Sequence, residues 1–227
     1  YNIVDRIYIA RIPEIGTTAL GAVGICFPLI MIITAFANLF GSGGAPLFSI
    51  NRGMKENEKA QIVMNTSFTM VCASGVILMV IGLIFARPLL LLFGASEDAL
   101  VCAYPYMMIY LIGTVPSMIA TGMNPFINAQ GYATTGMLSV AIGAVSNLIL
   151  DPLFIFVLGF GICGAAIATV LSQCLSAAYV LIFLEKKAEM KARLLKKKEL
   201  HSCKKYAQNI VSLGTAGFIM QLTNSLV

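Results

Sequence analysis

A carboxylate inside an apolar run is the residue best placed to do chemistry in this sequence. Asp151 lies within the run from about 136 to 158, and no basic residue is close to it in sequence. A charged side chain at the bilayer centre costs about 2.5–3.5 kcal/mol on insertion scales, so such residues face a cavity or an ion path. Asp151 is therefore a candidate for binding or relaying a cation, and a structural hydrogen bond between helices is the alternative.

Two neighbours of Asp151 extend this candidate site. Asn147 lies four residues earlier, so the two side chains share one helix face. Pro152 follows directly and has no backbone N–H, which frees the carbonyl of Leu148 one turn back. A carboxylate, an amide and a free carbonyl on one face suit a hard cation or a proton. The residues leave the choice between Na+ and H+ open.

Asp5 and Thr169 are further polar residues in apolar surroundings. Asp5 has Tyr1 four residues earlier on the same helix face. Arg6 stands beside Asp5, and an ion pair between them would be a purely structural explanation of both. Thr169 lies in an alanine-rich segment, and taken alone it indicates a hydroxyl bonded to its own helix backbone.

The composition shows which elements must position these residues. The 227 residues are 59% hydrophobic and 11% charged, with a mean hydropathy of +0.89. Soluble domains are about 45–50% apolar and about 25% charged, so a water-soluble globule and a disordered chain are both excluded. The apolar runs are continuous and do not alternate, which predicts an all-α polytopic membrane protein and not a barrel. We expect no enzyme and no cofactor, because the spans hold no nucleophile–base pair and no metal-ligand set.

The apolar runs divide the chain. They predict a truncated first helix over 1–12, spans over 19–50, 60–93, 100–127, 136–158 and 164–184, and a further helix that begins near 210. We group them as a six-helix lobe (1–185), a basic linker (186–205) and the start of a second lobe (206–227). Because the first and last helices are incomplete, we expect the chain to be part of a longer membrane protein.

The distribution of basic residues predicts the orientation. Nine of the 15 lysines and arginines lie between Lys186 and Lys205, and three more lie in the segment 51–59. Basic loops lie on the cytoplasmic side of a membrane. The linker 186–205 and the missing N-terminus are therefore expected to be cytoplasmic. Nucleic acid is not an expected partner, because no soluble domain accompanies the basic cluster.

Several segments resemble one family of transporters. They are Tyr-Asn-Ile-Val-Asp at 1–5, Thr-Ala-Leu-Gly-Ala-Val-Gly-Ile-Cys-Phe-Pro at 18–28, Asn-Ala-Gln-Gly at 128–131, Asn-Leu-Ile-Leu-Asp-Pro-Leu-Phe-Ile-Phe at 147–156 and Gly-Ile-Cys-Gly-Ala-Ala-Ile-Ala-Thr-Val-Leu-Ser-Gln at 161–173. These segments are similar to the multidrug and toxic compound extrusion (MATE) transporters. The resemblance implies twelve transmembrane helices in two six-helix lobes. This chain would be the N-terminal lobe plus the start of helix seven, with the C-terminal lobe as its partner.

The resemblance also implies an activity and a site. MATE transporters export cationic and amphipathic compounds across the cytoplasmic membrane while Na+ or H+ flows inward. By motif position, the residues of the family's cation site correspond to Asp5, Asn147, Asp151 and Thr169 in this sequence. The same four residues would bind Na+ if Na+ is the coupling ion. Tyr1 and Ala165 would be neighbours of this site. Arg6 departs from the family pattern, which leaves open whether Asp5 is free to bind a cation.

Two other functions fit a polytopic membrane protein. A flippase for lipid-linked precursors on the same scaffold would carry several basic residues to meet a pyrophosphate, yet Arg87 is the one basic residue between Ala60 and Leu184. A scaffold without transport activity would not need an unpaired Asp151 inside a span. Cation-coupled export is therefore the favoured function, with small-molecule substrates and membrane lipid as partners.

Overall fold

The computed structural model describes residues 2–12, 16–195 and 200–226, with side chains described over 5–12, 16–195 and 203–223. These residues form helices joined by short connections. In chain order the helices are α1 (Asn2–Ala10), α2 (Gly16–Gly53), α3 (Asn57–Leu92), α4 (Glu97–Ile112), α5 (Thr114–Ala129), α6 (Ala133–Pro152), the π-helix η1 (Leu153–Val157), α7 (Gly161–Lys186) and α8 (Leu200–Leu226). The all-α polytopic fold predicted from the apolar runs is thus confirmed.

Four of these helices are long and apolar enough to cross a membrane: α2, α3, α6 with η1, and α7. One span was expected over 100–127, but the structure has two helices there. The chain breaks at Gly113 into α4 and α5, which are bent by 57° relative to each other. A Cβ at Gly113 would lie 2.7 Å from a methyl group of Val170. Because glycine has no side chain, the backbone at the break can lie close to α7. If this bent pair counts as one span, the described residues hold five.

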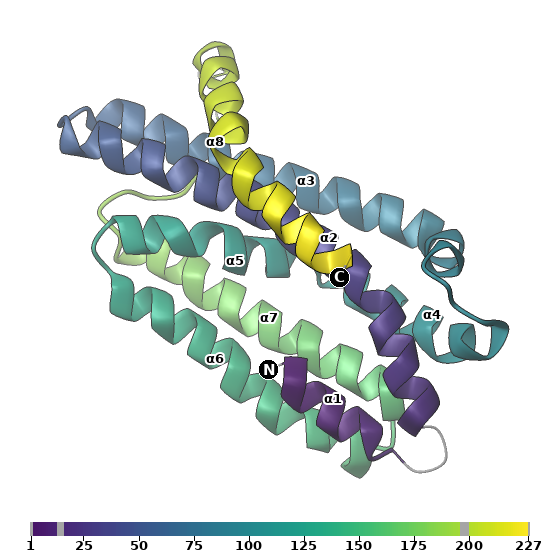
Figure 1. Ribbon diagram of the computed structural model, residues 1–227. Helices are drawn as coiled ribbons and strands as arrows, with labels where there is room; N and C mark the ends of the chain where they lie inside the picture. Colours follow the sequence, from purple (N-terminus) through teal and green to yellow (C-terminus); the bar gives the residue numbers. More distant parts are fainter. Residues whose placement is uncertain (1, 13–15, 196–199, 227) are drawn as a thin grey trace.

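The helices pack as a bundle with α2 in contact with most of the others. Figure 1 shows α1, α6 and α7 side by side, while α8 lies along α2. The core between α2, α3 and α5 contains Phe48 and Phe126, whose rings meet edge to face with centroids 5.6 Å apart. Large apolar side chains such as Ile84 on α3 and Ile149 on α6 remain more than half exposed, as expected of faces that contact lipid.

Glycines let α2 approach its neighbours closely. A Cβ at Gly43 would lie 2.1 Å from the carbonyl oxygen of Ile210, and one at Gly214 would lie 2.0 Å from that of Leu39. Helices in lipid associate through close packing, so small residues mark their crossing points. Gly43 and Gly214 therefore mark a close crossing of α2 and α8.

The end of α6 changes its winding at the predicted site. Directly after Pro152 the chain passes into the π-helix η1, and it then turns at Gly159 and Gly161, which have φ of +70° and +54°. Proline removes a backbone donor, and π-helical turns are found at functional sites. This change of winding lies immediately beside Asp151.

The helix after the basic linker starts earlier than expected, because α8 begins at Leu200 and not near 210. From Ala188 to Leu195 the chain has no regular secondary structure. The rest of the predicted linker, over 196–199, lies outside the described residues.

Candidate functional site: a buried carboxylate pair between three helices

The predicted site residues meet in the interior of the lobe. Asn147 and Asp151 on α6 are 1% and 0% exposed, and the amide nitrogen of Asn147 donates to Oδ1 of Asp151 at 3.2 Å. Asp5, on α1, is also buried, and its carboxyl group lies close to that of Asp151. Two neighbouring carboxyl groups can share one proton, because a protonated carboxyl donates and a carboxylate accepts.

Thr169 on α7 completes the group. Its hydroxyl donates to the carbonyl oxygen of Ala165 at 2.9 Å and accepts a long hydrogen bond, 3.5 Å, from the amide nitrogen of Asn147. The bond to its own helix, expected from the local sequence alone, is therefore present together with a contact to the site. Ala165 is buried beside it, whereas Tyr1 lies outside the described residues.

Three buried oxygens in this group have no hydrogen-bond donor among the described residues. They are Oδ1 of Asp5, Oδ1 of Asn147 and Oδ2 of Asp151. Buried polar atoms in native proteins are nearly always paired, so unpaired ones call for an explanation. Carboxylate, amide and hydroxyl oxygens are the ligands of hard cations, and the carboxylates also accept protons. The residues present therefore fit either Na+ or H+.

Arg6 does not neutralise Asp5. Its exposed guanidinium lies 5.2 Å from the centroid of the Phe27 ring on α2, and the described residues hold no ion pair between Arg6 and Asp5. Consecutive residues on a helix point in different directions, which places Asp5 in the interior while Arg6 points outward. The purely structural explanation of Asp5 as the partner of Arg6 is not supported.

The structure adds polar residues that sequence reasoning missed. On α4, buried Tyr106 lies near Asp5 and Asp151. One turn later, the hydroxyl of Tyr110 accepts from Nε2 of Gln173 on α7 at 3.3 Å. No local pattern placed the α4 tyrosines near the site, because their span is apolar and interrupted by prolines.

A cavity of about 310 Å3 opens next to Thr169. Its polar lining on α7 consists of Thr169, Ser172, Gln173 and Ser176, and α5 contributes Ser117, Thr121 and Asn124. The α7 residues follow Thr169 at three, four and seven positions, which places them on one helix face. That spacing is a signal in the sequence from which this wall could have been found.

A bundle of membrane-length helices with a buried, incompletely paired carboxylate site is typical of membrane transporters. A sequence model of the MatE family matches residues 1–153, and the chain belongs to that family. Its relatives are transporters and not enzymes, in agreement with the sequence-based expectation.

Individual relatives agree with this assignment. The chain is 27% identical over 201 residues to the multidrug export protein MepA of Staphylococcus haemolyticus, covering 88% of this chain and 44% of MepA. It is 29% identical over 199 residues to the FAD transporter of Shewanella oneidensis, covering 85% of this chain and 43% of that protein.

Solved structures place the fold within the same family. The chain matches an inward-facing multidrug resistance MATE transporter of the MOP superfamily with a TM-score of 0.89, and an outward-facing one with 0.88. Both are 27% identical, and the match covers all of this chain but 50% and 49% of theirs. The chain thus spans about half the length of these relatives and has the fold of a MATE N-terminal lobe with the start of the next helix.

Proposed function

We propose that the protein carrying this sequence is a cation-coupled antiporter that exports cationic or amphipathic compounds across the cytoplasmic membrane. The observation that supports this proposal is the set of buried oxygens without donors on Asp5, Asn147 and Asp151. Such a site favours an ion over an empty interior, because each unpaired buried acceptor costs free energy that a cation or proton recovers.

The coupling ion acts by linking helices. Na+ at this site would be held by oxygens of Asp5 on α1, Asn147 and Asp151 on α6, and Thr169 on α7. A proton would instead be shared by the two carboxyl groups. In either case the ion favours the packing of α1 against α6 and α7. An ion drives export only if it binds the two transporter states with different affinity, and movement of α1 supplies that difference.

The site residues are tested by ethidium efflux from cells that lack their own pumps and produce the whole protein. We expect wild type to export ethidium and Asp151→Asn to lose export at matched expression, because an amide binds neither a proton nor Na+ in the same way. Asp98→Asn is the matched control, since Asp98 is exposed at the start of α4. Removing the Na+ or the pH gradient in turn identifies the coupling ion. Full activity of Asp151→Asn would show that this residue is structural.

An anionic cargo is the second candidate, and it includes the lipid-linked precursors expected for a flippase. Arg6 favours it, as an exposed cation beside the site, and so does the similarity to an FAD transporter. The scarcity of basic residues between Ala60 and Leu184 argues against it. Competition of ethidium efflux by an anionic flavin nucleotide separates the two candidates: no competition supports cationic cargo, and strong competition supports the anionic one.

A further inference from the structure

The irregular segment after α7 is bound to the surface of the lobe. We call residues 188–195 the strap. The backbone nitrogen of Arg193 donates to Oδ1 of Asn65 at 3.0 Å, and that of Leu195 donates to the hydroxyl of Thr69 at 3.1 Å. The carbonyl oxygen of Lys191 accepts from Nε2 of Gln61 at 2.6 Å. Side chains of α3 thus bind the strap through its backbone.

The strap and α3 run in register. Gln61, Asn65 and Thr69 are spaced by four residues on α3, and their strap partners 191, 193 and 195 are spaced by two. Four helical residues rise about 6 Å, and two residues of extended chain cover about 6.6 Å. Because these two distances are nearly equal, every second strap residue lies beside the next polar side chain of α3. The helix therefore offers a row of evenly spaced hydrogen-bonding side chains to an extended segment.

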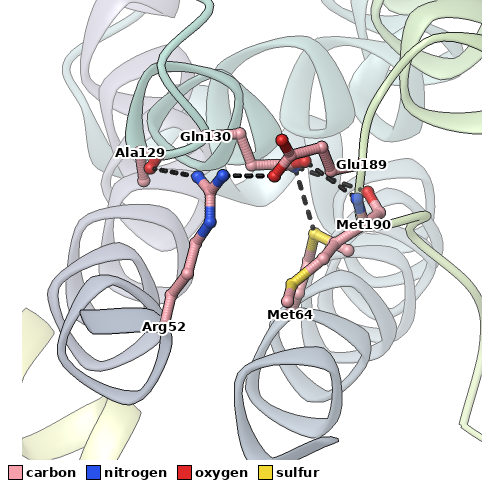
Figure 2. A network of polar contacts seen from close by, with 6 residues as sticks. All are labelled: Arg52, Met64, Ala129, Gln130, Glu189 and Met190. Carbon is pink, nitrogen blue, oxygen red and sulfur yellow. Dashed lines mark hydrogen bonds and ion pairs between the residues drawn. The ribbon is translucent and has the colours of Figure 1, made fainter. Parts of the chain in front are cut away.

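The start of the strap is held by the ends of α2 and α5, as Figure 2 shows. The side chain of Gln130 accepts from the backbone nitrogen of Met190 at 3.0 Å and donates to its carbonyl oxygen at 3.4 Å. Arg52 forms an ion pair with Glu189 and also donates to the carbonyl oxygen of Ala129 at 3.2 Å. One arginine therefore joins three segments that are far apart in the sequence.

Alternate strap side chains face the lobe. Ala188 is buried, and Met190 and Ala192 pack against the hydrophobic core, whereas Lys191 and Arg193 are exposed. An extended segment points successive side chains in opposite directions, which explains the alternation. The strap is thus fastened by its backbone, by small or apolar side chains and by one ion pair.

From these contacts we infer that the strap is a fixed part of this lobe and stays docked in both the inward-facing and the outward-facing state. The whole chain, strap and α8 included, resembles an inward-facing and an outward-facing transporter almost equally, with TM-scores of 0.89 and 0.88. The inference rests on the proposed function, because it concerns the two states of an alternating-access transporter.

Docking of the strap limits how far α8 can move. With Leu195 held on Thr69, five Cα steps separate it from Leu200, and they span at most about 18 Å. If the strap detached as far as Lys187, thirteen steps would span at most about 47 Å. The docked strap therefore keeps the start of α8 close to α3 while the lobes change their relative orientation.

Hydrogen exchange at single-amide resolution tests this inference in the full-length protein. The amides of Met190, Arg193 and Leu195 have side-chain acceptors, whereas for those of Lys191, Ala192 and Leu194 the structure shows no acceptor among the described residues. We expect the first three to exchange at least about tenfold more slowly than the last three, both with a saturating coupling ion and with a bound substrate, because hydrogen-bonded amides exchange only after opening.

Two variants show whether side chains of the lobe cause this protection. Gln130→Met removes both partners of Met190, and Asn65→Leu removes the acceptor of Arg193. Each should abolish protection of its own partner amide, while Gln208→Met, at an exposed position of α8, should leave it unchanged. Protection in only one condition, or in neither, would overturn the inference. Exchange needs no transport, so failure of the proposed function would appear separately, in the efflux assay.

Discussion

Asn147 donates from its amide nitrogen to Oδ1 of Asp151 at 3.2 Å, while Oδ1 of Asn147 and Oδ2 of Asp151 have no donor among the described residues. The amide thus orients the carboxyl group but does not satisfy it. Asp5 approaches the same carboxyl group from α1, so residues distant in sequence form a site with free oxygen ligands. The predictions below follow from this arrangement and from the packing around it.

Thr169 should contribute an oxygen to the ion and not merely a hydrogen bond to its helix. Thr169→Val removes the hydroxyl at nearly constant volume, whereas Thr169→Ser keeps it. A hydrogen bond to a charged group contributes about 1.5–3 kcal/mol, so the valine variant should need at least about tenfold more coupling ion for half-maximal efflux. The serine variant should stay within about threefold of wild type. Equal ion dependence of the two variants would mean that the hydroxyl is not a ligand.

Arg6 should have little effect on binding of the coupling ion. Its guanidinium is exposed and lies over Phe27, and an exposed charge interacts only weakly with its neighbours. We therefore expect Arg6→Gln to change the ion dependence of efflux by less than about threefold. The measurement is the ion concentration at half-maximal efflux, with Arg11→Gln as a control for loss of charge. A change of tenfold or more in Arg6→Gln alone would show that Arg6 controls the ion at Asp5.

The crossing of α2 and α8 should tolerate no side chain at Gly214. Gly214→Ala would bring a Cβ within 2.0 Å of the carbonyl oxygen of Leu39. Overpacking of this kind costs about 1–3 kcal/mol, which should appear as a lower midpoint of thermal unfolding. Gly217 lies one turn further along α8 with no atom within 4 Å of its Cβ position, so Gly217→Ala should be neutral or stabilising by up to about 1 kcal/mol. Equal effects of the two variants would contradict the close crossing.

Much of the fold could be predicted from the sequence, because apolar runs of membrane length determine helices almost directly. The spans predicted over 19–50 and 60–93 correspond to α2 and α3, whose ends differ from the prediction by a few residues. The break at Gly113 was not predicted, since prolines at 105, 116 and 125 lie in the same run and none of them marks it. At the break, Gly113 lies against Val170 on α7, and a local pattern does not contain that contact.

The site could be predicted in part. Asp151 and Asp5 were found as carboxylates in apolar runs, and Asn147 from its spacing to Asp151. Thr169 was assigned to the site only through the resemblance to MATE transporters. The direction of Arg6 and the nearness of Tyr106 depend on packing between helices, which spacing does not reveal. The strap was expected only as a basic linker, because the reciprocal bonds of Gln130 and Met190 join residues 60 positions apart.

The central claim is that Asp151 couples an ion to transport, and counterflow in proteoliposomes tests it most directly. An outward gradient of ethidium would be imposed on the purified full-length protein, and the movement of Na+ and of H+ in the opposite direction would be recorded. The account predicts that wild type moves one of the two ions, and that Asp151→Asn moves neither while it still binds ethidium with wild-type affinity. Ion movement by Asp151→Asn at the wild-type rate would contradict it.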